Sequence, residues 1–499
     1  MIHLLSIISL CHLLTLSCNV FAQSSNETIR AISFNIKPSY VPLAETLPPH
    51  TVIQRIWPKA ELRTDLPNLI PAIVVQQDGY HDGSLMGPPI HIQAGDRLQL
   101  SLKNEVPYTG LSIHLHGFEM SLAFEYDGAI GISQCPLSEG NTFTYNILAN
   151  ETPGTYWYHT QSGHMGVDAF DAVRGPLIVH PKGVDEQILV DRLNDSENYL
   201  QLGYSLLAYG DERILFFQDG FLSSGSRRYS HHIGDLYGPA SKDDEGFIAA
   251  TTPWEFGTCN GKLRDIIHVA SNRKYKFRLI NGGSHHALRI SIGSFPMTVV
   301  AADSEPVEAY TVDEVILHVG ERFDVEINIY GDIVEDERFW IRADTLESES
   351  QGYQSGIRAI MRVSTQQLIP PTIGDAEVID PSHHNFHTLR SKDSGWKTLN
   401  CHSEDKSSGC NPITVLSYSG IGVEEGSIAE SEIHTVDTHS QPSPQYGHFV
   451  KIDDSYFKQN ELPPVAMLSH KFRTSENSIH SNSVAMGVSR SSSIIIVWR

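Results

Sequence analysis

Two histidines with one residue between them, His114 and His116, end the alternating segment Leu111-Ser112-Ile113-His114-Leu115-His116. In a β-strand, residues i and i+2 point to the same face, about 7 Å apart along the backbone. Two imidazoles placed in this way suit one metal ion or two neighbouring ions. On its own the pattern is more typical of an ordinary pair of surface or core histidines, so the metal hypothesis needs support from other residues.

A second apolar segment, residues 154–161, supplies a further histidine, His159. Between the two segments lie Asp127-Gly128 and Gln134-Cys135-Pro136. Asp127 by itself is typical of a turn residue before glycine. The order of these groups along the chain strengthens the hypothesis of a metal site built from His114, His116 and His159.

The elements that must position these side chains are strands. Short β-rich runs at residues 90–102, 275–280, 298–302 and 322–329 are bounded by Gly, Pro, Asn and Asp, and long helical periodicities are scarce. Many short strands with regular turn signals predict β-sandwiches. A chain of 499 residues has room for about three domains of ~150 residues each, and we place boundaries near residues 182–197 and 365–380.

The N-terminal segment indicates a secreted chain, and the overall charge argues against some classes of partner. Residues 1–22 have an apolar centre, Leu4–Leu16, and a small-residue exit, which predicts a signal peptide; an uncleaved anchor is the alternative. No later segment is long and apolar enough to cross a bilayer. The net charge of −23 argues against nucleic acid or anionic lipid as a partner. Sequons that would allow N-glycosylation begin at Asn26, Asn150 and Asn194.

Four cysteines follow the predicted signal peptide: Cys135, Cys259, Cys401 and Cys410. In an oxidising compartment they allow three pairings. Cys401 and Cys410 are close together in a polar loop, so we expect a local disulfide there. A zinc site formed by Cys401, His402 and Cys410 is the alternative.

The chain resembles multicopper oxidases of the laccase and ascorbate oxidase type. The resemblance lies in Gly95-Asp96-Arg97, Ser112–Phe118, Asp127-Gly128, Gln134-Cys135-Pro136, Gly154–His159 and Arg174–His180. It continues through residues 261–262, 275–281, 301–303 and 319–325, and spans roughly residues 80 to 365 in the same order.

The resemblance implies an all-β fold of tandem cupredoxin-like (plastocyanin-like) Greek-key β-sandwiches, two complete and a third partial. The domains would be a signal peptide at 1–22, cupredoxin domain 1 at 60–182, domain 2 at 198–365 and a partial domain 3 at 381–499. Copper would be the cofactor, in a cluster of type 2 and type 3 ions. By position, His114 would bind the type 2 ion, His116 and His159 would bind type 3 ions, and Asp127 would relay protons beside the cluster.

The chain departs from the family pattern in two places. Gln161 stands where the family has a second histidine, and an amide oxygen is a weaker copper donor than imidazole. His164 could substitute only if the backbone turns at Ser162-Gly163. The family's C-terminal His-x-x-His-x-His and His-Cys-His segments do not occur, so the type 1 site is not encoded here, and we expect a truncated or mis-spliced version of a longer oxidase.

Two functions remain open on this evidence. The first is a secreted copper oxidoreductase that couples one-electron oxidation of phenol-like or other small donors to the reduction of dioxygen to water. The second is a catalytically inactive copper-binding or interaction protein on the same scaffold, because no blue-copper site would accept electrons from a donor.

Overall fold

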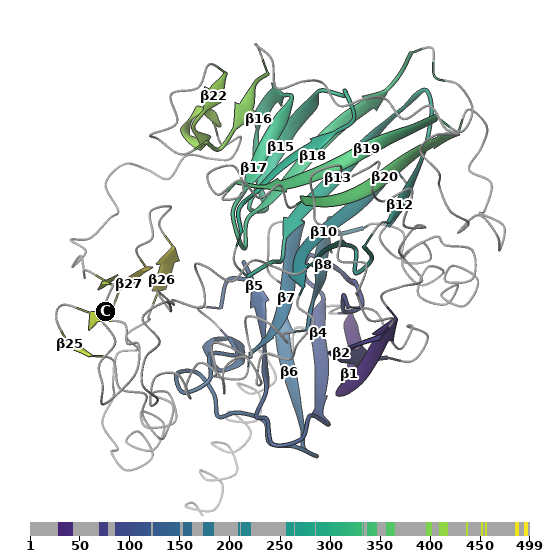
Figure 1. The fold of residues 1–499 in the computed structure, drawn as a ribbon. Coiled ribbons are helices and arrows are strands. Elements are labelled where there is room, and N and C mark those ends of the chain that lie inside the picture. Colours follow the sequence, from purple (N-terminus) through teal and green to yellow (C-terminus); the bar gives the residue numbers. More distant parts are fainter. Residues whose placement is uncertain are drawn as a thin grey trace, which may run out of the picture.

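The structure is a computed structural model (Figure 1). It describes residues 28–42, 69–77, 85–120, 123–149, 153–161, 173–183, 208–209, 211–220, 256–263, 265–284, 286–331, 333, 337–346, 356–364, 396–401 and 409–417, together with short strands at 436–437, 451–452, 455–456, 485–488 and 494–497. The predicted signal peptide and His164 lie outside these residues.

The first sandwich is made of two four-stranded sheets (Figure 1). One has the order β2-β1-β4-β6, with bounds Leu69–Gln76, Ile29–Pro42, Arg97–Asn104 and Thr142–Leu148. The other has the order β3-β8-β7-β5, with bounds Ile90–Gln93, Arg174–His180, Gly154–Gln161 and Ser112–His116. β1 runs parallel to β4, and β3 parallel to β8, while the other pairings are antiparallel.

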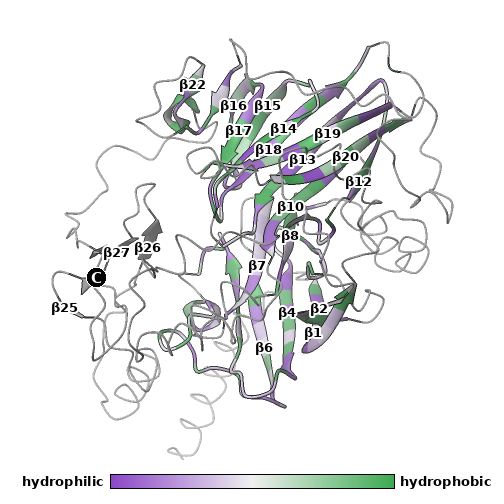
Figure 2. Ribbon diagram, in the orientation of Figure 1, coloured by the Kyte–Doolittle hydropathy of each residue, from purple (hydrophilic) through white to green (hydrophobic). Residues whose placement is uncertain are grey.

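Period-two alternation explains how these strands face the core. In β4, Leu98, Leu100 and Leu102 are buried between the sheets while the residues between them are less buried. In β5, Ile113 and Leu115 enter the same core, so the histidines beside them point away from it. Figure 2 shows this alternation of hydrophobic and hydrophilic residues along the strands.

The second sandwich has two larger sheets. One has the order β11-β10-β13-β18-β15-β16, with β9 beside β10; the bounds in chain order are Ala208–Tyr209 (β9), Glu212–Gly220 (β10), Phe256–Cys259 (β11), Arg273–Asn281 (β13), Met297–Ala302 (β15), Glu305–Val312 (β16) and Arg322–Ile329 (β18). The other has the order β12-β20-β19-β14-β17-β21-β22, and its bounds in chain order are Ile266–Ala270 (β12), Leu288–Ile292 (β14), Glu314–Leu317 (β17), Glu337–Thr345 (β19), Gly356–Ser364 (β20), Thr398–Leu399 (β21) and Cys410–Asn411 (β22). Alternate residues of β10, β13 and β18 fill the core between these sheets.

The opposite face of β10, β13 and β18 meets the first sandwich. Ile214, Phe216 and Ile280 pack with Trp157 and Ile178 in a small buried cluster that joins the two bodies. In Figure 1, β8 and β10 lie at this boundary. The interface is therefore made by the residues that alternate with the core residues of each strand.

A buried polar network secures the same interface. Thr155 of β7 donates its hydroxyl to Asp324, and Arg278 donates to Thr155 Oγ1 at 2.7 Å and to Asp324 Oδ2 at 2.8 Å. Arg322 donates its Nε to the Thr155 carbonyl at 3.0 Å, and Ser304 donates to the same oxygen at 2.6 Å. Because the charged groups are paired and hydrogen-bonded, their burial is tolerated.

Strands at two places in the chain lie outside the predicted boundaries of the sandwich to which they belong. β1, residues 29–42, belongs to the first sandwich although the predicted domain begins at residue 60. β21 and β22 extend a sheet of the second sandwich, although they fall in the range predicted for a third domain. β1 and β21 pair with strands that are far from them in the chain. Local periodicity does not indicate which sheet such a strand joins.

Beyond residue 417 the described strands form two small antiparallel groups. They are β23 (Val436–Asp437), β24 (Lys451–Ile452) and β25 (Ser455–Tyr456) in one, and β26 (Ala485–Val488) and β27 (Ile494–Val497) in the other. Two 3-10 turns, η2 (Phe124–Tyr126) and η3 (Ile413–Val415), complete the described elements. The all-β fold class is confirmed, and the partial third sandwich stays a prediction.

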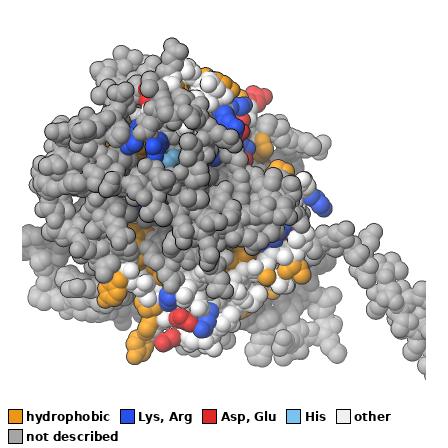
Figure 3. Space-filling view, turned by 90° about the vertical axis from the view of Figure 1, so that its right-hand side faces the viewer, with side chains coloured by type: hydrophobic (Ala, Val, Ile, Leu, Met, Phe, Trp, Pro, Cys, Tyr) orange, Lys and Arg blue, Asp and Glu red, His pale blue; other side chains and the backbone are white. Residues whose placement is uncertain are grey.

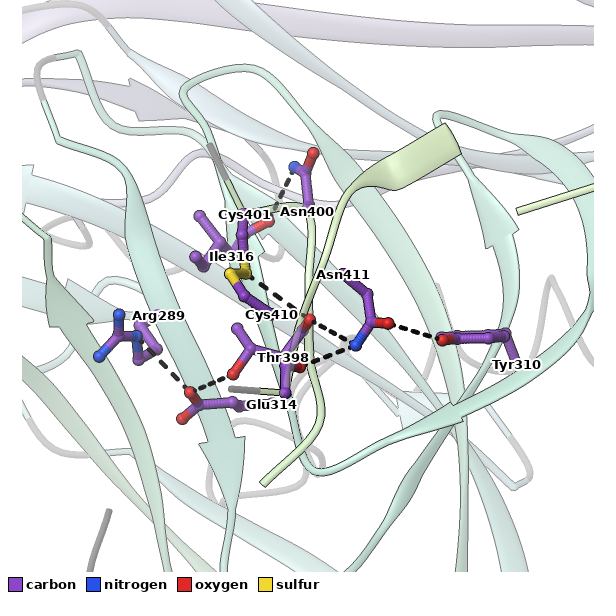
Figure 4. Close-up of a disulfide and its surroundings, with 10 residues drawn as sticks. Arg289, Tyr310, Glu314, Ile316, Thr398, Asn400, Cys401, Cys410 and Asn411 are labelled. Carbon is purple, nitrogen blue, oxygen red and sulfur yellow. Dashed lines mark hydrogen bonds and ion pairs between the residues drawn. A yellow bond between two sulfur atoms is a disulfide. The ribbon is translucent and has the colours of Figure 1, made fainter. Parts of the chain in front are cut away.

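The predicted disulfide between Cys401 and Cys410 is present, with the two Cα atoms 5.8 Å apart (Figure 4). It joins the ends of the loop between β21 and β22. The other two described cysteines, exposed Cys135 and buried Cys259, have free thiols. The pairing favours the disulfide over the zinc site at this loop.

The described surface mixes charges of both signs. Acidic and basic side chains lie beside one another on the described part of the face in Figure 3, and exposed pairs such as Lys274 with Glu326 occur on the second sandwich. Within the described ranges, no helix has the length and apolar character needed to span a membrane.

Candidate metal centre

Three histidines predicted from the sequence come together on the outer face of β5 and β7. His114 pairs directly with His159 in the antiparallel register, and His116 is two residues further along β5. The ring centroids are 5.3 Å apart for His114 and His159, 5.8 Å for His114 and His116, and 6.1 Å for His116 and His159. One nitrogen from each ring lies within 4.8 Å of the others, which is the spacing of ligands around a shared metal.

Hydrogen bonds fix the orientation of two of these rings. His114 donates its Nδ1 proton to the Asp127 carbonyl at 2.7 Å, with the Asp127 carboxylate Oδ1 at 3.2 Å from the same nitrogen. His159 directs its Nδ1 at the Thr160 carbonyl at 3.3 Å. When Nδ1 carries the proton, the Nε2 lone pair is free to bind a metal ion, and such a bond also sets the angle of the ring.

The turn that carries Asp127 is held against β5 by the glycine after it. Gly128 has φ +82°, and a Cβ atom there would lie 2.1 Å from the Ile113 carbonyl oxygen. Ser112 of β5 donates its hydroxyl proton to the Gly128 carbonyl. Only glycine allows this approach, which explains why an Asp-Gly pair brings a carboxylate to His114.

Burial keeps the imidazoles of His116 and His159 in their neutral form. It lowers the pKa of His159 to about 3, and the neighbouring His114 and the charge of Arg174 act in the same direction. Burial also lowers the pKa of His116 well below 6.5, with Arg322 as the next cause. Metal ions bind neutral imidazole, so at neutral pH these two rings are available as ligands without first losing a proton.

Residues from both sandwiches enclose His116. The Trp157 indole stacks on its ring with centroids 4.6 Å apart. From the second sandwich, Gly320 lies so close that an added Cβ would be 2.9 Å from His116 Cε1. Trp157 also donates its indole proton to the Gly320 carbonyl at 3.3 Å, and Arg322 donates to that oxygen at the same distance. The cluster therefore lies at the margin of the interface between the sandwiches.

The other predicted site residues have different positions. Gln161 is on the same face of β7 as His159 but pairs with Ser112, not with a histidine. It is half-buried. His164 lies outside the described residues.

Sequence reasoning did not assign Trp157, Gly320 and Arg322 to the site. Trp157 could have been found, because it precedes His159 by two residues and so shares its face. Gly320 and Arg322 carry no local signal, because only the docking of the second sandwich brings them to His116.

The donor set fits copper. Three imidazoles converge on one point, and neutral imidazole nitrogen is a preferred ligand for copper as well as for zinc, iron and nickel. The stacked Trp157 indole and the half-buried, neutral rings of His116 and His159 add to this fit.

Two family models described as multicopper oxidase match the chain, over residues 72–183 and 226–363. Together they cover about half of the chain, and each falls on one of the two sandwiches. The chain belongs to the multicopper oxidase family. Membership of this family implies copper as the cofactor.

Curated relatives agree with this assignment. Laccase-2 of Botryotinia fuckeliana is 27% identical over 314 residues, which is 60% of this chain and 48% of the relative. L-ascorbate oxidase of Brassica rapa subsp. pekinensis is 29% identical, over 49% of this chain and 42% of the relative. The chain thus spans about half the length of the curated relatives it matches.

A solved structure supports the fold. The crystal structure of Fet3p, described as a multicopper oxidase that functions in iron import, aligns with a TM-score of 0.56 and 17% identity, over 87% of this chain and 65% of that one. At this identity the similarity concerns the fold alone.

Proposed function

We propose that this chain is a secreted, copper-dependent oxidoreductase that couples oxidation of a phenol-like or other small one-electron donor to the reduction of dioxygen to water. One observation carries the proposal: in a member of the multicopper oxidase family, His114, His116 and His159 place ligand nitrogens within 4.8 Å of one another. Secretion is supported by the apolar segment Leu4–Leu16 at the N-terminus.

The proposed site residues have two roles, copper binding and proton transfer. His114, His116 and His159 would hold copper of the type 2 and type 3 kind, which supplies the one-electron redox chemistry when bound. The Asp127 backbone carbonyl orients the His114 ring by accepting its Nδ1 proton. The Asp127 carboxylate, 16% exposed and 3.2 Å from the same nitrogen, can hold a proton at Oδ1 and deliver it to the reduced oxygen.

A second candidate is copper binding without turnover. Gln161 favours it, because an amide replaces an imidazole that the family places at this position on β7. The loss of one soft nitrogen donor would weaken copper binding or change its potential.

The test is copper uptake followed by oxygen consumption. The purified full chain is loaded with copper, and bound copper per chain is measured by mass spectrometry in parallel with His114→Ala and His159→Ala variants. His286→Ala serves as the control, because this histidine belongs to the second sandwich and not to the cluster. The proposal expects uptake that the two cluster variants lose and the control keeps.

Turnover is measured with an oxygen electrode and a phenolic donor such as 2,6-dimethoxyphenol. Oxygen consumption that depends on the donor and on copper supports the oxidoreductase, with Asp127→Asn expected to lower the rate while it retains copper. Copper uptake without oxygen consumption supports the second candidate, and an absence of uptake contradicts both.

A further inference from the structure

A turn of the second sandwich, residues 318–322, connects the metal centre to a part of the chain much later in sequence. On one side, Gly320 contacts the His116 ring and accepts the Trp157 indole proton. Its φ of +86° and the 2.9 Å to which a Cβ atom would approach His116 leave no room for a side chain. The position of this turn therefore limits where the His116 ring can lie.

On its other side, the 318–322 turn is held by Asn400. The Asn400 amide donates to Glu321 Oε2 at 2.7 Å and to the Ile316 carbonyl at 2.9 Å. The same Glu321 oxygen accepts the backbone proton of His318 at 2.9 Å. The carboxylate thus closes the turn on itself and ties it to Asn400, and hydrogen bonds to a charged acceptor are stronger than those between neutral groups.

Asn400 is itself fixed by the disulfide loop (Figure 4). It is 5% exposed, has φ +67° and directly precedes Cys401, which is bonded to Cys410. Asparagine tolerates this left-handed backbone better than most residues. β21 and β22 pair in parallel on either side of the loop, and the Thr398 hydroxyl donates to Glu314 at 2.6 Å.

The geometry points to Asn400 as a positioning residue for the metal centre. Its amide, anchored by the Cys401–Cys410 disulfide, holds Glu321 and through it Gly320, which sets the position of the His116 ring. Asn400 does not touch the metal ligands, so its effect is transmitted through the 318–322 turn. This inference rests on the proposed function, in which His116 is a copper ligand.

Two substitutions of Asn400 separate the amide from the backbone. Asn400→Gly removes the amide and keeps a residue that readily adopts φ +67°. Asn400→Asp keeps the size but sets a second carboxylate against Glu321. The matched control is Asn411→Ala, because Asn411 donates to Thr398 and Gly409 within the same loop and does not reach the turn.

Copper affinity of the full chain is measured by competition with a chelator, and the surroundings of bound Cu(II) by electron paramagnetic resonance. We expect roughly tenfold weaker binding and an altered spectrum for both Asn400 variants, as for other residues that orient a metal ligand. The Asn411→Ala variant should bind as the parent does. The Cys401→Ala/Cys410→Ala double variant should weaken binding in the same direction.

Hydrogen exchange tests the connection without copper. The Gly320 amide donates to the Asn281 carbonyl at 2.9 Å, and its exchange should be faster in Asn400→Gly than in Asn411→Ala at matched thermal stability. Equal copper affinity and equal exchange in Asn400→Gly and the parent would overturn the inference alone. A parent chain that binds no copper would instead contradict the proposed function, and unchanged Gly320 exchange would still refute the positioning role.

Discussion

The two sandwiches use the same strand alternation for different purposes. In the first sandwich, the face of β5 and β7 that points away from the core carries His114, His116 and His159. In the second, the face of β13 and β18 that points away from the core carries paired charges, such as Arg278 with Asp324, that dock it to the first. Under the proposed function, the first sandwich supplies the copper ligands, and the second supplies the surface that positions them.

If the three histidines bind copper as proposed, the metal centre depends on residues that offer it no donor atom. Gly320 contributes only its backbone and the absence of a side chain, and Arg322 contributes charge and anchoring hydrogen bonds.

Removal of the buried Arg278 guanidinium at the interface should lower the free energy of unfolding the most. Arg278 and Asp324 are 5% and 6% exposed in their side chains, so Arg278→Met leaves an uncompensated buried carboxylate. We expect a loss of about 3–5 kcal/mol in the free energy of unfolding, measured by urea unfolding. The control is Arg273→Met, whose pair with Asp211 is more than half exposed and should cost less than about 1 kcal/mol. Equal losses in the two variants would refute the role of the buried network.

The lowered pKa values of the half-buried His116 and His159 should make the metal-free protein sensitive to acid. The folded pKa of His159 is about 3 and its unfolded value about 6.5, so above pH 6.5 the ring is neutral in both states. As pH falls below 6.5 the unfolded chain binds a proton that the folded chain does not, and stability should fall by about 1.4 kcal/mol per pH unit until pH approaches 3.

Urea unfolding between pH 6.5 and 5 measures this slope. A His159→Gln variant lacks the titrating group. The slope of its free energy of unfolding against pH should therefore be smaller than that of the parent by about 1.4 kcal/mol per pH unit. Parallel curves for the parent and the variant would show that His159 is not held neutral by burial.

A side chain added at Gly320, in the second sandwich, should displace the His116 ring of the first sandwich. Gly320→Ala forces a residue with a Cβ into φ +86° and against His116, and we expect a loss of about 1–3 kcal/mol with weaker copper binding. Gly140→Ala has a similar φ of +79° but no atom within 4 Å, so it isolates the backbone strain. Thermal melting and copper titration of both variants give the comparison; weakened copper binding in Gly140→Ala as well would assign the effect to strain alone.

Restoration of an imidazole at Gln161 should have the smallest effect and the opposite sign. Gln161→His adds a donor on the face of His159, and copper affinity should rise by about tenfold, which corresponds to about 1.4 kcal/mol. Chelator competition measures it, with Thr160→His as the control because residue 160 is buried on the other side of β7. Unchanged affinity in Gln161→His would place residue 161 outside the copper-binding set.

Much of the first sandwich and its site could be predicted from local sequence. The alternation of Ile113 and Leu115 with His114 and His116 fixes which side chains share a face, because the pleat has a period of two. The Asp-Gly pair at 127–128 marks a tight turn for the same local reason. The family resemblance then supplied copper as the metal, which spacing alone does not distinguish from zinc or iron.

Local sequence was enough to predict the all-β fold, the three histidines on two strands and a disulfide between Cys401 and Cys410, because each of these depends on residues close together in the chain. Three further features became visible in the folded chain: the register that sets His114 opposite His159, the pairing of β1 and β21 with strands far away in the chain, and the contact of Gly320 with His116. These depend on which surfaces pack together between segments 45 to 204 residues apart in the chain. Such contacts are selected by shape and buried charge, and they leave no periodic trace in the sequence.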